Sequence, residues 1–219
     1  MVAMVMAVTT DLNDIESRIV SYRGTMADGV TADRVVNPHF GADGLLRPAA
    51  VLVPIVARDD GPTVLFTQRT DHLEHHPGQV SFPGGHVEEG DGSPEETAIR
   101  ETEEEVGLRR CHIEVLGRID TYLTSTGFSV IPVVARIDPP FEIRPDPEEV
   151  AEVFEVPLSF LLDPENHKRE TRLFGDQTWY AYAMPYNGYN IWGVTAGMVR
   201  NFYEILAGVP VTLETDSQG

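Results

Sequence analysis

The sequence is poor in cysteine, in lysine and in long apolar runs. It has one cysteine, Cys111, in 219 residues, which excludes a disulfide framework and a multi-cysteine zinc site. We expect Cys111 to be a small buried hydrophobe in a reducing compartment. Lys168 is the only lysine, so arginine carries nearly all of the positive charge. No stretch reaches the ~18 consecutive apolar residues of a membrane span.

Secretory and peroxisomal targeting signals are also missing. The apolar opening, residues 1–8, is short and has no basic residue before it, whereas a secretory signal needs a positive leader and a longer apolar core. The final Ser-Gln-Gly is not a peroxisomal address. We therefore expect a cytoplasmic protein.

Basic side chains are scarce relative to acidic ones. The chain has 16 Lys and Arg against 35 Asp and Glu, a formal net charge of -19. This excess of acidic residues argues against nucleic acid or an anionic membrane as the main partner, because binding either one requires a positively charged surface. An acidic protein that acts on an anionic substrate would need divalent cations between the two.

The pattern of hydrophobicity predicts one elaborated domain or two small ones, at roughly 150 residues per domain. Strands alternate with helices along the chain, which indicates an α/β protein. Helices are expected at residues 12–22, 158–162 and 196–206, and strands at 50–57, 63–67, 113–119, 128–137, 149–156 and 178–184. Residues 24–48 are expected to be a connecting segment, residues 70–92 a loop and residues 214–219 a frayed tail.

The most clearly marked element is an acidic helix after residue 92. Ser93 suits the N-cap, Pro94 the first helical position and Glu96 the third, while Gly107 suits the C-terminal cap. Ile99, Thr102 and Val106 are expected to pack on the domain, with Glu103 pointing elsewhere.

Three glutamates of this helix, Glu101, Glu104 and Glu105, fall within an arc of about 100° at ~100° per residue. Acidic runs on helices are usually solvated surface. Here, however, like charges repel at these spacings and crowd the end of the helix where the dipole disfavours anions. Three carboxylates on one face suit a hard divalent cation such as Mg²⁺. Arg100, one turn before Glu104, can orient it or offset the repulsion.

Residues 81–108, SFPGGHVEEGDGSPEETAIRETEEEVGL, resemble the signature of Nudix hydrolases. In that signature a glycine, five residues, a glutamate and seven residues precede R-E-U-x-E-E-x-G-U, where U is bulky or aliphatic. Residues 100–108 match the second half, with Thr102 at a position that is usually more apolar. The first half departs, because Gly92 or Asp91 stands where the first glutamate is expected and the loop has one extra residue.

The departure itself resembles the coenzyme A diphosphatase branch of the family, which has this longer loop. That branch also carries an upstream motif, L-L-T-x-R-[SA]-x-x-x-R-x-x-x-G-x-x-x-F-P-G-G. Here Arg69, Gly78 and residues 82–85 stand at the right spacing, while Phe66 and Thr70 are mild departures and Glu74 reverses the charge of an arginine. The resemblance covers about residues 46–207. It implies a Nudix fold, a mixed β-sheet sandwiched between α-helices.

The resemblance also implies a metal-dependent hydrolysis. Water would attack the diphosphate of coenzyme A or acyl-CoA with Mg²⁺ or Mn²⁺, giving 3′,5′-ADP and 4′-phosphopantetheine or its acyl form. Glu101 and Glu105 would be metal ligands, joined by the Gly84 carbonyl. Glu104 would be a further ligand or help to deprotonate water, and Arg100 would hold the glutamates.

Three other residues complete the site that the resemblance implies. Glu149 would join the metal site or act as base, or else be a solvated acid at a strand edge. Arg69 would contact phosphate, and Gly85 beside Gly84 would let the backbone approach the metal and phosphates closely. The histidines at 72, 75, 76 and 86 suggest zinc, which the lack of a nearby cysteine disfavours. His75 or His76 could contact phosphate in place of the missing arginine.

Two other functions stay open. Glu74 favours a Nudix pyrophosphatase that acts on ADP-ribose, NADH or a dinucleoside polyphosphate, and a non-catalytic nucleotide sensor is a further alternative. By this reading residues 1–45 form an N-terminal helix and connecting segment, 46–210 the Nudix hydrolase domain and 211–219 a flexible tail. A homodimer is a reasonable expectation from the family.

Overall fold

The computed structural model describes residues 8–24, 30–32, 46–72, 76–174 and 177–209. Within these residues the strands form a large mixed sheet of nine strands and a small antiparallel sheet of three. The large sheet contains β1 (Val30–Ala32), β2 (Arg47–Val56), β3 (Thr63–Arg69), β4 (Val80–Ser81), β5 (Gly84–His86), β6 (Ile113–Arg118), β7 (Thr121–Leu123), β8 (Phe128–Ile137) and β9 (Val150–Pro157). The small sheet contains β10 (Lys168–Phe174), β11 (Gln177–Tyr186) and β12 (Tyr189–Trp192).

The centre of the large sheet is a parallel pair, β2 and β8, in register from Arg47 opposite Phe128 to Val56 opposite Ile137. β1 and β7 are also parallel, and the other neighbours are antiparallel. β2 is almost continuously buried after its first two residues. A strand that is covered on both faces needs such an apolar run rather than an alternating one.

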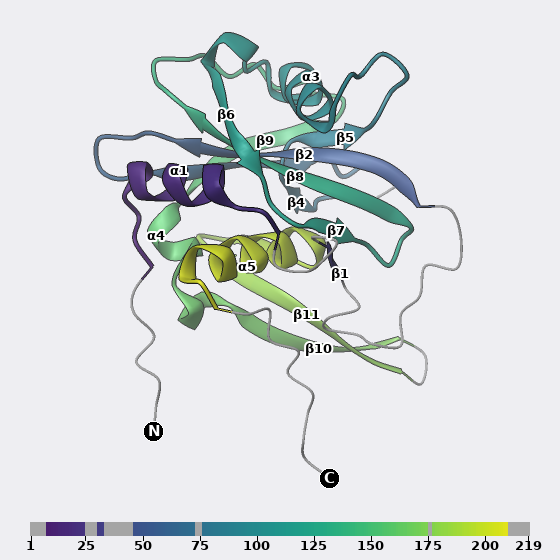
Figure 1. Cartoon of the computed structure of the whole chain (residues 1–219). Helices are drawn as coiled ribbons and strands as arrows, with labels where there is room; N and C mark the ends of the chain where they lie inside the picture. Colours follow the sequence, from purple (N-terminus) through teal and green to yellow (C-terminus); the bar gives the residue numbers. More distant parts are fainter. Residues whose placement is uncertain (1–7, 25–29, 33–45, 73–75, 175–176, 210–219) are drawn as a thin grey trace.

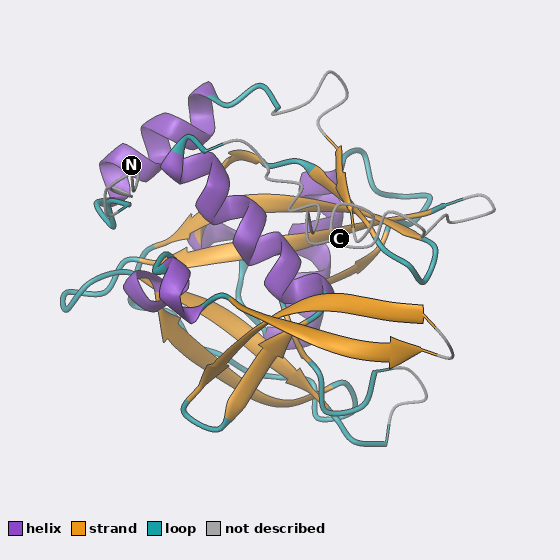
Figure 2. Ribbon diagram, turned by 90° about the horizontal axis from the view of Figure 1, so that it is seen from below, coloured by secondary structure: helices purple, strands orange, loops and turns teal. Residues whose placement is uncertain are grey.

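Helices cover both faces of the large sheet (Figures 1 and 2). The helix α3 (Pro94–Val106) lies above it in Figure 1, and α1 (Leu12–Ser21) and α5 (Val194–Ala207) lie below it, with β10 and β11 beyond α5. The short α4 (Leu158–Leu161) follows β9. Two hydrophobic clusters correspond to these layers. The cluster on the α3 side includes Leu52 and Val106, and the larger cluster on the other side includes Ile19 and Phe202.

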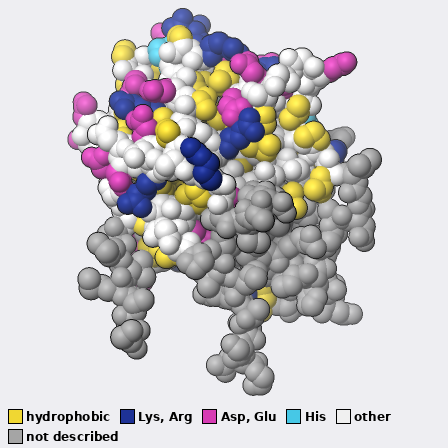
Figure 3. Space-filling model, in the orientation of Figure 1, with side chains coloured by type: hydrophobic (Ala, Val, Ile, Leu, Met, Phe, Trp, Pro, Cys, Tyr) yellow, Lys and Arg dark blue, Asp and Glu magenta, His cyan; other side chains and the backbone are white. Residues whose placement is uncertain are grey.

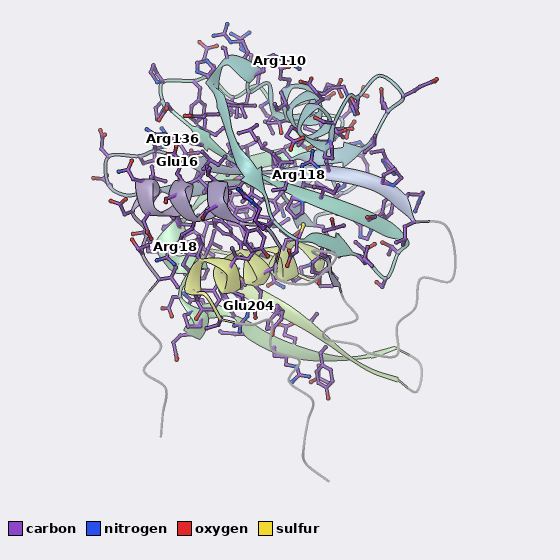
Figure 4. All side chains as sticks on the ribbon, viewed as in Figure 1. Glu16, Arg18, Arg110, Arg118, Arg136 and Glu204 are labelled. Atoms are coloured by element: carbon purple, nitrogen blue, oxygen red, sulfur yellow. The ribbon has the colours of Figure 1, made fainter. Side chains whose placement is uncertain are left out.

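The N-terminal helix α1 is part of the main core. Asp11 caps it by accepting hydrogen bonds from the N–H groups of Asn13 and Asp14. Ile15 and Ile19 are buried, and Arg18 donates a 3.0 Å hydrogen bond to the carbonyl of Leu206 in α5. Figure 4 shows Arg18 between the two helices. The first and last described helices therefore stabilise each other.

The predicted α/β fold, with a mixed sheet between helices, is confirmed, and so are its longer elements. The expected helix at 12–22 is α1, the expected strand at 128–137 is β8 and the helix at 196–206 lies within α5. The expected loop at 70–92 is wrong in part, because it contains the short strands β4 and β5. β7, β10 and β12 were not predicted, and β1 lies inside the expected connecting segment 24–48.

Cys111 is exposed, so the prediction of a buried side chain is wrong. It lies in a single 3-10 turn, Arg110–His112, none of whose residues is buried. No helix among the described residues is long and apolar enough to cross a membrane. Glu74, His75 and the tail at 214–219 lie outside the described residues, as do residue 45 and residues 210–211, where the proposed domain limits fall.

Candidate active site

The helix α3 is fixed at both ends by the caps that its sequence predicts. Ser93 accepts a 3.3 Å hydrogen bond from the N–H of Glu96, and Pro94 occupies the first turn. Gly107 ends the helix in the left-handed conformation, with φ 69°. A Cβ there would lie 2.9 Å from the carbonyl oxygen of Arg144, so glycine allows the segment after residue 143 to close against the helix end.

Glu105 is the most deeply buried acid of this helix, with a relative exposure of 6%. Its carboxylate accepts a 3.1 Å hydrogen bond from the backbone N–H of Gly84. Burial raises the pKa of Glu105 to about 8, and the charges of Glu101 and Glu149 add to the rise against the opposing effects of the Gly84 N–H and Arg69. A buried carboxylate among other carboxylates is costly unless a cation accompanies it.

Glu101 lies one turn earlier on the helix, directly against β5. Burial raises its pKa, which Arg100 opposes and the charges of Glu104 and Glu149 reinforce. A Cβ on Gly85 would lie 2.5 Å from the carboxyl carbon of Glu101. Gly85 therefore allows this carboxylate to lie against the backbone of β5.

Arg100 connects the acids of α3 to the loop that precedes the helix. Its Nε and one terminal nitrogen donate to the two oxygens of Asp91, at 3.1 and 3.0 Å. The other terminal nitrogen donates to Glu101 and Glu104, each at 3.0 Å. Asp91 also accepts from the N–H of Glu88 and from the hydroxyl of Thr97. The guanidinium holds the pKa of Asp91 far below its usual range, so Asp91 fixes Arg100, which in turn orients two glutamates.

A distant segment places Glu149 beside the same helix. The N–H groups of Arg144 and Asp146 donate to the carbonyls of Val106 and Glu105, at 2.8 and 2.9 Å. Downstream, the N–H of Thr70 donates to the carbonyl of Glu149 at 3.0 Å. Residues 144–149 are thus tied to the end of α3 on one side and to the end of β3 on the other.

Arg69 is the last residue of β3 and lies next to a register shift in its pairing with β9. The charge of Arg69 lowers the pKa of Glu105, which places the guanidinium within electrostatic reach of the acidic group. Its buried Nε has no hydrogen-bond partner. A buried donor without an acceptor is rare in a folded chain and is suited to an anionic ligand.

Within the described part of the chain, no three His, Cys, Asp or Glu side chains converge closely enough to form a ready-made metal site. Glu101 and Glu104 are turned toward Arg100 instead, and Glu105 toward the Gly84 N–H. The donor set nevertheless fits a hard divalent cation. Glu105 and Glu101 are oxygen donors whose pKa values are both raised by burial, and the charge of Glu101 raises that of Glu105 further. A divalent cation would reverse these effects.

The structure brings most of the predicted site residues together. Glu101, Glu105, Gly84, Gly85, Arg69 and Glu149 surround one end of α3, and Arg100 links Glu101 to the more exposed Glu104. Glu103 points elsewhere, as predicted, and pairs with Arg110. Of the residues expected to pack on the domain, Thr102 and Val106 are buried as predicted, whereas Ile99 is only partly buried and Ala98 is buried instead.

One residue of this site was not predicted to have a role. Asp91 stood out only as a possible substitute for a missing motif glutamate, yet it binds Arg100 through both oxygens. The available signal was an acid six residues after Gly85, in the loop before a helix whose single basic residue is Arg100.

Residues 46–176 match the NUDIX domain. A protein of Escherichia coli strain K12, called uncharacterized Nudix hydrolase NudL, is 39% identical over 186 residues, which cover 83% of this chain and 95% of that protein. A protein of the same name from Enterobacter sp. strain 638 is 38% identical over 180 residues, covering 80% and 92%.

Solved structures give weaker similarity. An Ap4A hydrolase of C. elegans in a binary complex has a TM-score of 0.44 and 23% identity, covering 50% of this chain and 80% of that one. A MutT/nudix family protein from Enterococcus faecalis has a TM-score of 0.42 and 18% identity, covering 70% and 53%.

Proposed function

The chain belongs to the Nudix family, and from that membership we propose that it hydrolyses the diphosphate of coenzyme A or acyl-CoA. The products would be 3′,5′-ADP and 4′-phosphopantetheine or its acyl form. The observation that carries the hydrolase part of the proposal is the convergence of Glu101, Glu105 and Glu149 beside two backbone glycines and Arg69.

The chain's own residues have distinct tasks in this proposal. Glu101, Glu105 and the Gly84 carbonyl would hold Mg²⁺ or Mn²⁺, with Glu104 as a further ligand or an aid to proton removal. The metal would lower the pKa of water and neutralise charge on the diphosphate. Arg69, whose buried Nε–H has no partner in the chain, would bind a phosphate oxygen. Glu149, whose charge acts on both Glu101 and Glu105, would join the metal site or take the proton from water.

Support for coenzyme A as the substrate comes from the upstream motif. Arg69 is separated from the glycines of β5 by the loop that contains Gly78, which has φ 67° and so needs glycine. Phe82 is buried, and its ring stacks on Phe66 at 4.9 Å between centroids. These residues fix the loop so that Arg69 and the backbone of Gly84 both face Glu105.

Product analysis by chromatography tests the proposal. The protein is incubated with Mg²⁺ or Mn²⁺ and, separately, with coenzyme A, acetyl-coenzyme A, ADP-ribose, NADH and diadenosine polyphosphate. Release of 3′,5′-ADP mainly from the coenzyme A compounds is expected. Turnover of another substrate alone would retain the hydrolase and refute the coenzyme A assignment.

Three isosteric variants of α3 test the assignment of the site. Glu101→Gln and Glu105→Gln should abolish turnover and leave the fold intact. Glu103→Gln is the matched control, because Glu103 lies on the same helix but pairs with Arg110. Wild-type rates in either of the first two variants would refute the proposed metal site.

One alternative has a specific observation in its favour. Glu74 replaces an arginine of the coenzyme A branch motif with the opposite charge, which favours a diphosphate substrate such as ADP-ribose, NADH or a dinucleoside polyphosphate. A sensor that binds nucleotide without turnover is disfavoured, because such a site gains nothing from burying Glu105 among like charges.

A further inference from the structure

Many of the arginines that the structure describes are paired with acids. Figure 3 shows Lys and Arg side chains interspersed with Asp and Glu over the upper part of one face. Among the described residues, ion pairs within 4.0 Å are formed by Arg18, Arg58, Arg100, Arg110, Arg118, Arg136, Arg144 and Arg200. Arg47, the first residue of β2, and Arg69, the last residue of β3, form none with a described carboxylate, and neither do Arg23 and Arg109. Arg69 already has a role in the proposed site, and of the other three Arg47 is the one on the strand that pairs with β5.

Arg47 is exposed and held on an aromatic ring instead. Its guanidinium carbon lies 4.0 Å from the ring centroid of Phe128, and the ring of His86 meets Phe128 edge-on at 5.2 Å. A guanidinium stacked on a ring keeps its N–H donors in its own plane, free for a bidentate acceptor. The stack therefore orients Arg47 without using the donors that bind phosphate.

The backbone under this stack is fixed. The N–H of Arg47 donates to the carbonyl of Gly127 at 2.9 Å. The N–H of Phe128 donates to the hydroxyl of Thr124 at 3.0 Å, which closes the turn between β7 and β8. Arg47 and Phe128 are also opposite each other in the parallel pairing of β2 and β8. Both side chains thus start from backbone positions that ligand binding need not reorganise.

The stack is adjacent to the proposed diphosphate site. His86 is two residues beyond Gly84 on the same face of β5, about 7 Å along a strand. The carbonyl of His86 accepts a 3.0 Å hydrogen bond from Arg100, which also binds Glu101. In the pairing of β2 with β5, His86 is opposite Ala49, two residues from Arg47. Gly84 is opposite Val51 in the same pairing, so Arg47 starts about 13 Å along β2 from Gly84, with His86 between them. The ribose and the 5′-diphosphate of one nucleotide together have to span this separation.

We propose that Arg47, stacked on Phe128 and flanked by His86, binds a phosphomonoester on the ribose of the substrate. The inference rests on the proposed function, because it takes the diphosphate to lie at Gly84 and Glu105. The phosphate is carried at the 3′ position in coenzyme A, and a 2′-phosphorylated dinucleotide would offer the same chemistry. In a chain of net charge -19, an unpaired arginine at this position selects substrates that carry the extra anionic group.

Binding of compounds that have no diphosphate to cleave separates this proposal from catalysis. The full chain is titrated calorimetrically with 3′,5′-ADP, 2′,5′-ADP and 5′-AMP. The wild type should bind one of the two bisphosphates about tenfold or more tightly than 5′-AMP, the effect of one charged hydrogen-bonded contact. Arg47→Ala should reduce this ratio to about one, while Arg47→Lys keeps part of it.

Two further variants show whether the effect is specific. Arg109→Ala removes an exposed arginine of the 3-10 turn and should leave the ratio unchanged. Phe128→Leu keeps an apolar side chain but removes the ring, and should lower the ratio by less than Arg47→Ala. A preference for 2′,5′-ADP would support the phosphate subsite but show that it takes a 2′-phosphate of the ribose rather than a 3′-phosphate.

The two proposals fail in different ways. An Arg47-dependent preference for a bisphosphate in a protein that does not cleave coenzyme A would support the subsite and refute the proposed substrate. If the protein cleaves coenzyme A, and Arg47→Ala does not change the ratio of its affinities for the bisphosphate and for 5′-AMP, the subsite alone is refuted. A wild type that binds 5′-AMP as tightly as both bisphosphates would also overturn it.

Discussion

Replacing Gly85 with alanine should inactivate the protein without unfolding it. The added Cβ would lie 2.5 Å from both the carboxyl carbon and Oε1 of Glu101. Ordinary carbon contacts are ~3.5–4.0 Å, so the carboxylate must move by roughly 1 Å. The atoms that must move are the free end of a flexible side chain, and Gly85, unlike Gly84, does not have a positive φ.

The expected loss of activity follows from that displacement. Misplacing a reacting group by ~1 Å costs about 10²-fold in rate, so kcat/KM of Gly85→Ala should fall by about that factor. The midpoint of thermal unfolding should stay close to that of the wild type. Steady-state kinetics on the substrate that the product analysis identifies, together with a calorimetric melt, would measure both quantities.

Neighbouring glycines provide the controls. Cβ atoms on Gly90 or Gly92 would meet nothing within 4 Å, so alanine there should change neither activity nor stability. At Gly84 a Cβ would lie 2.5 Å from the carbonyl oxygen of Ala50, so alanine should destabilise the fold itself.

A second substitution can restore the space. Glu101→Asp shortens the side chain by one methylene, and combined with Gly85→Ala it should recover part of the lost activity. The reasoning would be refuted if Gly85→Ala kept wild-type kcat/KM, or if it lost stability in proportion to activity.

Asp91→Asn should lower kcat by about tenfold with little change in KM, as is typical when a partner that orients a metal ligand is lost, which steady-state kinetics would measure. The pKa of His167 is lowered by burial and by the charge of Arg200. His167 is therefore protonated at a higher pH in the unfolded chain than in the folded one, and the free energy of unfolding should fall as pH drops below about 6.5. His167→Gln should reduce this pH dependence of the melting temperature, measured between pH 5 and 8. Gly197→Ala should lower the melting temperature although alanine favours a helix by about 1 kcal/mol, because its Cβ would clash with the phenol of buried Tyr122.

The sequence was informative where structure is local. The caps of α3 are adjacent in sequence to the helix, and Ser93 and Gly107 behave as their residue types require. β8 was predicted with its observed limits because its ten residues are mostly apolar and rich in valine and isoleucine, which favours a buried strand. The strands that were missed have two to seven residues. β4 and β5 exist only because β3 and β2 supply their partners, so their own residues show no periodicity.

In the site, too, features that depend on one element were predictable and features that depend on distant segments were not. A helical arc groups Glu101, Glu104 and Glu105, since these positions depend on one element. In the structure Arg100 links Glu101 and Glu104, whereas Glu105 turns to the N–H of Gly84. The spacing of the motif could not show that Asp91 meets Arg100 with both oxygens, because that contact depends on the path of a loop. Arg47 was not singled out, because its proximity to β5 follows from strand pairing across the sheet. Whether the protein is a homodimer stays a prediction.

The backbone hydrogen bonds that join residues 144–149 to α3 and to the end of β3 have a consequence for how the site forms. Helix α3 carries its own caps and can begin to form from local interactions, but Glu105 meets Gly84 across a separation of 21 residues. Glu149 arrives only when its segment has closed against both α3 and β3. Each closure requires chain entropy to be lost before the contacts can compensate for it. We therefore expect the acidic group to be assembled late in folding, with helix α3 formed before Glu105, Gly84 and Glu149 are brought together.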